Sequence, residues 1–487
     1  MKKNKATLTV VSALLLCAMA LGLAGCAGEA EPKDLDAIAG STNQTAAPSD
    51  EGTTATEKKP ETGDDSPAET EKEAVPETRD VLEADEEPAE SDSRVSASNL
   101  MKNVKAESTY AKPADERFIS SQMRLSVDLF KGSVGKSKNK NVLISPLSIE
   151  LALAMTANGA DGQTRAEMET LLGGDTTIEE LNEYLRTYVK SLPSDEKYKL
   201  GIANSIWFRD DESLTVKKDF LQTNADYYGA QVYKAPFDDS TVNDINSWVD
   251  EHTDGLIGGI LKEIDESKML YLINAMVFDA EWQDIYRETA VKDGTFTSIA
   301  GDERDVQMMA SGESKYLDDG RATGFIKNYS GGRYSFAALL PNEDIDIYEY
   351  IDGLTDEGLL DTLENAERCT VNAEMPKFSS EYSLNMTVVL SELGMPTAFE
   401  KLADFSKMGN YMGFNLFISD VVHTTCIKVN ERGTEAGAVT SVEMSAAASA
   451  APTKVRDVTL DRPFVYMIID NSTNLPIFIG VVVDITE

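Results

Sequence analysis

Apolar residues recur at helical spacing through much of the chain that follows residue 113. Side chains three or four positions apart lie on one face of a helix, so this spacing predicts amphipathic helices that bury one side. In the third helix we expect Thr164 to cap the start and Gly173 to mark the end. The predicted helices cover residues 118–132, 148–157, 164–173 and 176–192.

Shorter apolar runs, rich in β-branched and aromatic residues, predict strands, most of them in the C-terminal half. Helices early and strands late are typical of an α+β protein, and we expect a large, mainly antiparallel sheet. No internal repeat is visible. The predicted strands cover residues 201–208, 269–278, 333–340, 370–378, 423–430, 464–469 and 477–484.

One stretch near the C-terminus fits neither pattern. Between Gly433 and Pro452 there is no aromatic residue, and the only charges are Glu435 and Glu443. Alternate side chains of a strand point to opposite faces, and both glutamates fall on one set of alternate positions. The other set is uncharged and consists of Thr434, Ala436, Ala438, Thr440, Val442 and Met444. Such a segment can form a strand that buries one face without burying a charge. The alternative is a chance composition in a low-complexity loop.

The first 26 residues have the order of a secretory signal, with three lysines before an apolar run over residues 8–23. The run ends in Leu-Ala-Gly-Cys, which resembles the lipobox of bacterial lipoproteins. This resemblance implies that residues 1–25 are removed and that Cys26 carries lipid. The protein would then lie on the extracellular face of a bacterial cell membrane, or be released from it. Ordinary signal cleavage with an uninvolved Cys26 is the alternative, and the run is short for a transmembrane anchor.

Charge separates the rest of the chain into two parts. The whole chain has a net charge of −39, and residues 27–100 contain 21 acidic but only 6 basic side chains. That segment is rich in Thr, Ala, Pro and Ser and can bury little surface. We therefore expect an acidic disordered tether over residues 27–112 and a globular domain over 113–487. The negative charge argues against nucleic acid and heparin as partners.

The sequence has no recognisable catalytic or metal-binding motif. Neither of its two histidines, His252 and His423, has the spacing of a metal-binding pair. A Gly-x-Ser-x-Gly motif, a phosphate-binding glycine loop and Cys-x-x-Cys are all missing. We expect His252 on a surface helix and His423 buried and hydrogen-bonded in a strand. The sequence predicts no enzyme activity, no metal and no cofactor.

From about residue 118 to 484 the chain resembles a serpin, through eight segments in the family's order. These are "NVLISPLSIELALAMTANGADGQTRAEMETLLG", "IANSIWF", "INSWVDEHTDGLI", "LINAMVFDAEW", "VNAEMPKF", "ELGMPTAFEKLADFS", "HTTCIKVNERGTEAGA" and "DRPFVYMIIDNSTNLPIFIGVV". The resemblance implies an α+β serpin fold. It has a large mixed or antiparallel central sheet, smaller sheets, eight or nine helices and an exposed reactive-centre loop.

Serpins inhibit proteases by being cut in that loop, and the resemblance implies the same suicide mechanism here. The protease forms an acyl-enzyme, the cut loop inserts as an extra strand into a five-stranded sheet, and the protease is distorted before water releases it. The resemblance assigns a hinge to Glu431, Gly433, Thr434, Glu435, Ala436, Gly437 and Ala438. It assigns the opening of the sheet to Ser148, Asn274, His423, Trp282 and Lys377, with Glu431 paired to Lys377. Ordinary core packing is the alternative role for the sheet-opening residues.

Counting seventeen residues from Glu431, as the family does, places the cut bond at Ala447–Ala448, with Met444–Ser445 as the alternative. Alanine before the cut is typical of targets with a small primary pocket, so we expect elastase-like or subtilisin-like serine proteases, with cysteine proteases as a further class. The helix over 176–192 lacks the basic face of heparin-activated relatives, and we expect a monomer. The alternative function is a non-inhibitory serpin-fold binding protein.

Two cysteines, Cys369 and Cys426, remain beyond the signal and the lipidation site. If Glu431 opposes Lys377 in antiparallel strands, Cys426 opposes residue 382. Cys369 is then about thirteen strand residues away, on the order of 40 Å. We therefore expect no disulfide.

Overall fold

The computed structural model describes residues 81–82, 97–195, 197–413, 415–434 and 454–485. Among the described residues, no helix is both long and apolar enough to span a membrane. Several residues singled out from the sequence lie outside these ranges: Cys26, Glu435, Ala436, Gly437, Ala438, Met444, Ser445, Ala447 and Ala448.

The helices of the described residues confirm the α+β class; three of the four predicted helices are longer than expected by a few residues, and the one predicted over 176–192 is slightly shorter. The helices are α1 (Glu116–Lys136), α2 (Pro146–Ala157), α3 (Gly162–Gly173), α4 (Ile178–Ser191), α5 (Lys218–Tyr228), α6 (Asp239–His252), α7 (Ile347–Asp352), α8 (Asp356–Glu364) and α9 (Thr387–Glu392), with 3-10 turns at Glu288–Ala290 and Pro396–Phe399. The expected cap of α3 is wrong, because the N-cap is Asp161. Thr164 lies inside the helix, and its hydroxyl accepts a hydrogen bond from the backbone N–H of Asp404.

The central sheet has the order β14-β16-β17-β8-β5-β7-β2. Its strands are β14 (Phe378–Asn385), β16 (Asp420–Val429), β17 (Gly433–Thr434), β8 (Leu270–Glu281), β5 (Tyr198–Arg209), β7 (Gln231–Ala235) and β2 (Ser98–Asn99). Two of them, β17 and β2, are only two residues long, which leaves the five longer strands that were expected. The sheet is mixed, because β16 pairs parallel with β8 and β5 pairs parallel with β7.

A second sheet follows the order β18-β13-β10-β11-β12-β19-β20-β4, and β9 pairs with β10 beside this path. Its strands are β18 (Val455–Thr459), β13 (Glu367–Pro376), β10 (Glu303–Asp318), β11 (Ala322–Asn328), β12 (Tyr334–Pro341), β19 (Phe464–Asp470), β20 (Pro476–Val482), β4 (Val142–Ile144) and β9 (Val291–Thr297). Two small sheets pair β1 (Val81–Leu82) with β3 (Thr109–Tyr110) and β6 (Leu214–Val216) with β15 (Gly409–Tyr411).

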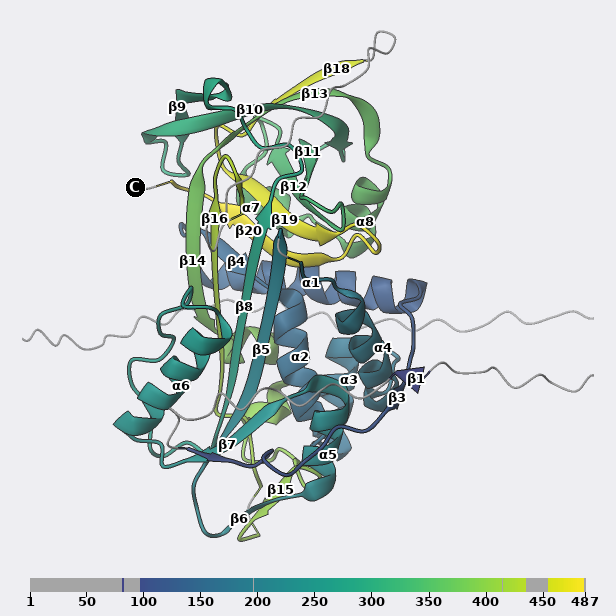
Figure 1. Cartoon of the computed structure of the whole chain (residues 1–487), viewed down its shortest axis with the longest axis vertical. Coiled ribbons are helices and arrows are strands. Elements are labelled where there is room, and N and C mark those ends of the chain that lie inside the picture. The colour runs from purple at the N-terminus through teal and green to yellow at the C-terminus, as the bar shows by residue number, and fades with distance from the viewer. Residues whose placement is uncertain (1–80, 83–96, 196, 414, 435–453, 486–487) are drawn as a thin grey trace, which may run out of the picture. The chain divides into compact units, whose positions relative to one another are not determined.

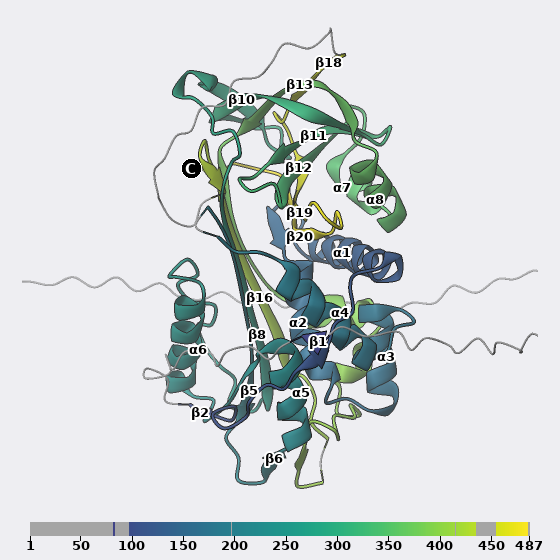
Figure 2. The same cartoon turned by 45° about the vertical axis from the view of Figure 1, so that its right-hand side comes forward.

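The central sheet is covered on both faces, which explains the continuous apolar run of β8. Figures 1 and 2 show α6 on one face and α2 on the other. Alternate β8 side chains, including Ile273 and Val277, pack with Trp248 of α6. The intervening ones, including Leu272 and Met276, belong to the main core. Strands buried on both faces do not show the alternation of polar and apolar residues seen in half-exposed strands.

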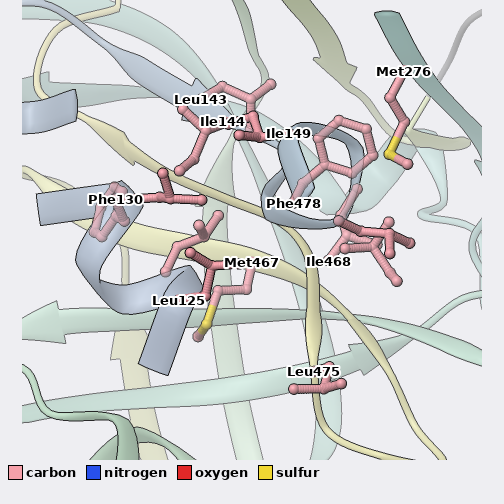
Figure 3. Packing of buried hydrophobic residues seen from close by; sticks show 14 of the residues in the cluster. Leu125, Phe130, Leu143, Ile144, Ile149, Met276, Met467, Ile468, Leu475 and Phe478 are labelled. Carbon is pink, nitrogen blue, oxygen red and sulfur yellow. The ribbon is translucent and has the colours of Figure 1, made fainter. Parts of the chain in front are cut away.

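One part of the main core lies where α1 and α2 pack against the two sheets. Leu125 and Phe130 of α1, Ile149 of α2 and Phe478 of β20 lie together there, with Met276 of β8 near them (Figure 3). All five are at most 1 % exposed. Burial of side chains this large contributes about 1.5–3 kcal/mol each.

Residues 97–112, expected to belong to the tether, pack on the domain instead. Ser98 and Asn99 pair with the edge of β7, and the N–H of Leu100 donates to the carbonyl of Val232. Leu100, Met101 and Val104 pack against the main core. Further along, the N–H of Lys112 donates to the Thr187 hydroxyl. In the structure, therefore, the packed part of the chain begins before residue 113.

Candidate functional site

A tight turn links β16 to β17, at the start of the expected hinge. The side-chain Oδ1 of Asn430 accepts hydrogen bonds from the N–H groups of Arg432 and Gly433, and its own N–H donates to the carbonyl of Gly433. An asparagine that bonds its own following backbone in this way stabilises a turn without help from the rest of the fold.

Two aromatic residues, Trp282 and Tyr286, donate hydrogen bonds to the backbone of this turn. The indole Nε1 of Trp282 donates to the carbonyl of Asn430 at 2.8 Å, and its backbone N–H donates to the carbonyl of Arg432 at 2.8 Å. The N–H of Tyr286 donates to the carbonyl of Glu431 at 2.9 Å. Trp282 is 1 % exposed and stacks on Tyr329 at 4.4 Å between ring centroids. Three successive carbonyls of the turn, those of Asn430, Glu431 and Arg432, thereby accept hydrogen bonds.

Two residues of the expected hinge, Gly433 and Thr434, lie inside the central sheet as β17. β17 runs between β16 and β8, with Thr434 opposite Val429 on one side and Ala280 on the other. Thr434 is fully buried, and its hydroxyl hydrogen-bonds to that of Tyr329 at 2.5 Å. At Gly433 a Cβ would lie 2.0 Å from the Ala280 carbonyl oxygen, so only glycine fits this close approach.

Below this point β16 and β8 pair directly, and a buried polar network holds them together. His423 lies opposite Asn274 in the parallel register. The Nδ1–H of His423 donates to Asn274 Oδ1 at 2.8 Å, and its Nε2 accepts from the backbone N–H of Ser145 at 3.1 Å. The Asn274 amide donates to the Ser148 carbonyl at 2.5 Å and to Asn204 Oδ1. The network thus joins both strands to the start of α2.

Burial keeps His423 neutral. The side chain is fully buried, and desolvation lowers its pKa from 6.5 to about 3. A neutral imidazole has one donor and one acceptor nitrogen, which matches the carboxamide oxygen and the amide N–H that it faces.

Lys377 and Glu431 form an ion pair at 2.7 Å on the partly exposed side of the hinge. The hydrogen bond from Lys377 lowers the pKa of Glu431. The expected register of these strands is wrong by one residue. Phe378 pairs with Val429, so Cys426 lies opposite Glu381 rather than residue 382, and the ion pair is diagonal.

A second ion pair next to Trp282 was not predicted from the sequence. Lys327 of β11 lies 3.0 Å from Glu313, and its side chain is 3 % exposed. Its ammonium group also donates to the Asp284 carbonyl and lies 4.4 Å from the centroid of the Tyr286 ring. The charge is therefore buried beside the aromatic residues that hold the hinge.

The structure divides the residues singled out from the sequence into two groups. Trp282, Lys377, Glu431, Gly433 and Thr434 meet at the upper end of the gap between β8 and β16, whereas Ser148, Asn274 and His423 meet lower down. Sequence reasoning missed Ser145, Asn204, Tyr329 and Asn430. Of these, only Asn430 carries a local signal, an asparagine three residues before a glycine.

Other chemistry is sparse in the described residues. They contain no cluster of three or more His, Cys, Asp or Glu side chains able to hold a metal. Cys369 and Cys426 are both free, and burial raises the pKa of each thiol. The second histidine, His252, is half-buried at the end of α6 and stacks on Trp248.

Comparisons with known proteins agree with this arrangement. An uncharacterised serpin-like protein of Thermococcus kodakarensis is 32 % identical over 360 residues, which are 72 % of this chain and 82 % of the relative. The leukocyte elastase inhibitor of Sus scrofa is 30 % identical and is covered over 98 % of its length by 75 % of this chain.

Among solved structures, the thermophilic serpin tengpin in its native state is 50 % identical, with a TM-score of 0.77 over 80 % of this chain and all of tengpin. The latent state of tengpin gives a lower TM-score of 0.69, with 77 % of this chain covered. Human thyroxine-binding globulin is 25 % identical, with a TM-score of 0.68 over 76 % of this chain and 99 % of that protein. The family model described as "Serpin (serine protease inhibitor)" matches residues 120–485, and the chain therefore belongs to the serpin family.

Proposed function

We propose that this serpin inhibits serine proteases that accept a small residue before the cut, by inserting its own cleaved loop into the central sheet. The family supports protease inhibition in general. The observation that carries the mechanism is the position of Thr434, which is fully buried between β16 and β8. A strand that begins there can lengthen only by separating the direct β16–β8 pairs below it.

The chemistry begins as ordinary proteolysis. The protease serine hydroxyl attacks the carbonyl carbon of Ala447 and forms an ester bond, the Ala447–Ala448 amide bond breaks, and the proton from the serine hydroxyl passes to the nitrogen of Ala448, which leaves as an amine. The loop now ends in an ester to the protease and is free to move. Insertion carries the ester away from the second catalytic step, in which water would release the protease.

The free energy for this distortion comes from strand formation. Fourteen residues run from Thr434 to Ala447. At about 0.5–1.5 kcal/mol net for each new hydrogen bond, insertion supplies on the order of 10 kcal/mol. This is comparable with the whole stability of a protease domain.

The proposed specificity depends on Ala447. A small primary pocket, as in elastase-like and subtilisin-like proteases, accepts alanine, whereas a trypsin-like pocket needs Arg or Lys. The similarity to a leukocyte elastase inhibitor supports this preference.

The direct test is to mix the protein with pancreatic elastase, and separately with trypsin, and to separate the products on a denaturing gel. We expect a covalent band at the summed mass with elastase. Mass spectrometry of the released C-terminal peptide should give Ala448 as its first residue. Complete cleavage without a covalent band would instead favour a non-inhibitory binding protein, a role for which thyroxine-binding globulin shows that the fold is suited.

A lipid anchor at Cys26 is the second part of the proposal. The apolar run that ends in Leu-Ala-Gly-Cys supports it. The anchor would hold the inhibitor on the extracellular face of a bacterial cell membrane. In a bacterial host fed an alkyne-labelled fatty acid, we expect label on the wild type and none on Cys26→Ala, which should appear in the medium. An unlabelled wild type would overturn the anchor and leave the inhibition untouched.

A further inference from the structure

Lys327 of β11 brings a charge into the interior of the protein, close to the turn between β16 and β17. The residue is buried, and its Nζ lies 3.0 Å from Glu313 Oε1 of β10 and 3.1 Å from the carbonyl oxygen of Asp284. An ammonium group loses its hydration on burial, so its neighbours must supply charge and acceptors in place of water. The contacts of Lys327 therefore indicate what its charge does.

The same ammonium group lies over two aromatic rings. Its Nζ is 4.4 Å from the centroid of the Tyr286 ring and 5.5 Å from that of the Trp282 ring. A cation within about 6 Å of an aromatic ring is attracted to the negative face of the ring, most strongly where water is excluded. The two rings meet edge to face, with an angle of 83° between their planes. One charge thus fixes the orientation of both rings.

Both aromatic residues bind the backbone of the turn. The indole of Trp282 and the backbone N–H of Tyr286 donate to two successive carbonyls of the turn. Asp284, whose carbonyl accepts from Lys327, lies between them in the chain. The ammonium group therefore contacts the segment 282–286 at three points, and this segment in turn contacts the residues that precede β17.

Residues of β10 fix the other end of the Tyr286 side chain. The Ser311 hydroxyl lies 2.7 Å from Glu313 Oε1 and 3.3 Å from the Tyr286 hydroxyl. Tyr286 is thus contacted by Lys327 at its ring and by Ser311 at its hydroxyl. Because β10 and β11 belong to the second sheet, the turn in the central sheet is positioned from the second sheet.

Stability alone does not account for a buried pair of this kind. The cost of removing two charges from water offsets most of their attraction, and apolar residues of similar size often replace such a pair without loss of stability. An apolar side chain, however, has no charge with which to orient two rings and one carbonyl oxygen at once. The contacts of Lys327 therefore favour a role in geometry.

We propose that Lys327 is a positioning residue for loop insertion. Through the rings of Trp282 and Tyr286 it keeps the turn fixed, so that β17 is aligned with the gap between β8 and β16 when the loop is cut. This inference rests on the proposed inhibition. Insertion competes with hydrolysis of the ester, so a turn that moves more freely delays the entry of the strand and lets water release more of the protease.

Lys327→Met tests the role of the charge, because it nearly keeps the length of the side chain. The stoichiometry of inhibition is the number of inhibitor molecules consumed for each elastase molecule trapped. We expect it to rise by at least about threefold, because a small misalignment slows the step that depends on it. The rate at which elastase cuts the loop should not change. An unchanged stoichiometry would overturn the proposal.

Lys234→Met is the matched control. Lys234 of β7 is also largely buried, and its ammonium group donates to the carbonyls of Asp211 and Leu214. In the central sheet β8 and β5 lie between β7 and β17. This variant should therefore keep the stoichiometry of the wild type. An equal rise in both variants would mean that a general loss of stability, and not the turn, sets the stoichiometry.

A double variant separates positioning from stability. Lys327→Met leaves Glu313 buried without its cation, which lowers the melting temperature or prevents folding. The combination of Lys327→Met with Glu313→Gln removes both charges and should recover the melting temperature, while the stoichiometry of inhibition stays raised. If both quantities return to their wild-type values, Lys327 acts on stability alone and the proposal is wrong.

Hydrogen exchange of the uncut proteins tests the turn without a protease. In the double variant, peptides that cover residues 430–434 should exchange faster than in the wild type, and peptides that cover residues 231–235 should not change. Equal exchange over 430–434 in the two proteins would contradict the positioning. A wild type that forms no covalent complex with elastase would overturn the proposed function, and the exchange over 430–434 would then decide by itself whether Lys327 positions the turn.

Discussion

The gap between β8 and β16 is closed in two different ways along its length. In the lower half the strands pair directly from Asp420–Tyr271 to Thr425–Met276. In the upper half Gly433 and Thr434 lie between them. The lower half is therefore closed by direct pairing of β16 with β8, whereas the upper half already has a short additional strand, β17, between them.

The side chains of the two halves match this difference. Below, a neutral histidine and an asparagine bond to each other and to the start of α2, so that separating the strands breaks buried hydrogen bonds. Above, Trp282 bonds to Asn430 of the turn, and Tyr329 bonds to Thr434 of β17. In the proposed insertion, the lower half resists opening, whereas the upper half already contains Gly433 and Thr434, at the start of the segment that enters. The following changes test this division.

The largest effect is expected from Thr434→Arg, which places a long charged side chain at a fully buried position. Insertion should stall at its first residue, and hydrolysis should then release the protease. We expect the covalent elastase band to disappear while cleavage of the loop continues. Thr434→Ser keeps the hydroxyl that bonds to Tyr329 and should keep the band. A band that persists in Thr434→Arg means that insertion does not pass through this position.

His423→Ala should give the next largest effect, because it leaves the Ser145 N–H and Asn274 Oδ1 buried without their partner. At about 1–3 kcal/mol for each of the two unsatisfied groups, we expect the free energy of unfolding to fall by about 2–6 kcal/mol in urea titrations. Lys428→Ala, on the same strand with an exposed side chain, is the control and should change it by less than about 0.5 kcal/mol. A similar loss of unfolding free energy in both variants would show that the hydrogen bonds of His423 do not stabilise the pairing of β8 with β16.

The same histidine should make stability depend on pH. Its pKa is about 3 in the folded protein and 6.5 when unperturbed. Below pH 6.5 the unfolded chain binds a proton that the folded protein does not bind. The contribution of the neutral His423 to the free energy of unfolding is therefore complete above pH 6.5. It is lost as the pH falls toward 3, by up to about 1.4 kcal/mol per pH unit. Urea titrations between pH 7.5 and 5.5 should show a steeper loss for the wild type than for His423→Ala, and parallel curves would contradict the prediction.

Tyr329→Phe should act on the upper half alone. It leaves the buried Thr434 hydroxyl without the Tyr329 partner and should cost about 1–3 kcal/mol. Hydrogen exchange followed by mass spectrometry should show faster exchange in peptides that cover residues 430–434 and unchanged exchange over 420–425. Faster exchange in both segments would mean that the two halves open together.

The smallest effect is expected from Glu431→Gln, because the ion pair with Lys377 is partly exposed, with 40 % of the Glu431 side chain accessible. Such pairs contribute up to about 1 kcal/mol and are screened by salt. Lys377 lowers the pKa of Glu431, so this contribution is present above about pH 4.5 and is lost as the pH falls through the lowered value. At high salt the wild type and Glu431→Gln should unfold at nearly the same urea concentration. A difference that salt does not reduce points to packing rather than charge.

Sequence patterns predicted those parts of the fold in which neighbours along the chain decide the structure. The spacing of apolar residues over 118–132 led to α1, and the run over 269–278 led to β8. The cap at Thr164 failed because the helix begins earlier, with Asp161 at the N-cap position, and the hydroxyl of Thr164 bonds a residue 240 positions away. No local pattern contains that contact.

The site shows the same limit. The resemblance to serpins marked His423 and Asn274, but the N–H of Ser145 that completes their network is 278 residues distant from His423. For residues 97–112 the acidic composition of the preceding segment hid three apolar side chains, Leu100, Met101 and Val104, which pack on the core. The average composition of a long segment does not reveal a few apolar residues at its end.

The pairing of Ser98 and Asn99 with β7 has a consequence for solubility. An uncovered strand edge presents N–H and carbonyl groups that can capture an extended peptide from another molecule. These two residues, together with the bond from Leu100 to Val232, occupy part of the outer edge of β7. A chain shortened to begin at residue 113 would lose this cover, and its β7 edge would become a template for aggregation.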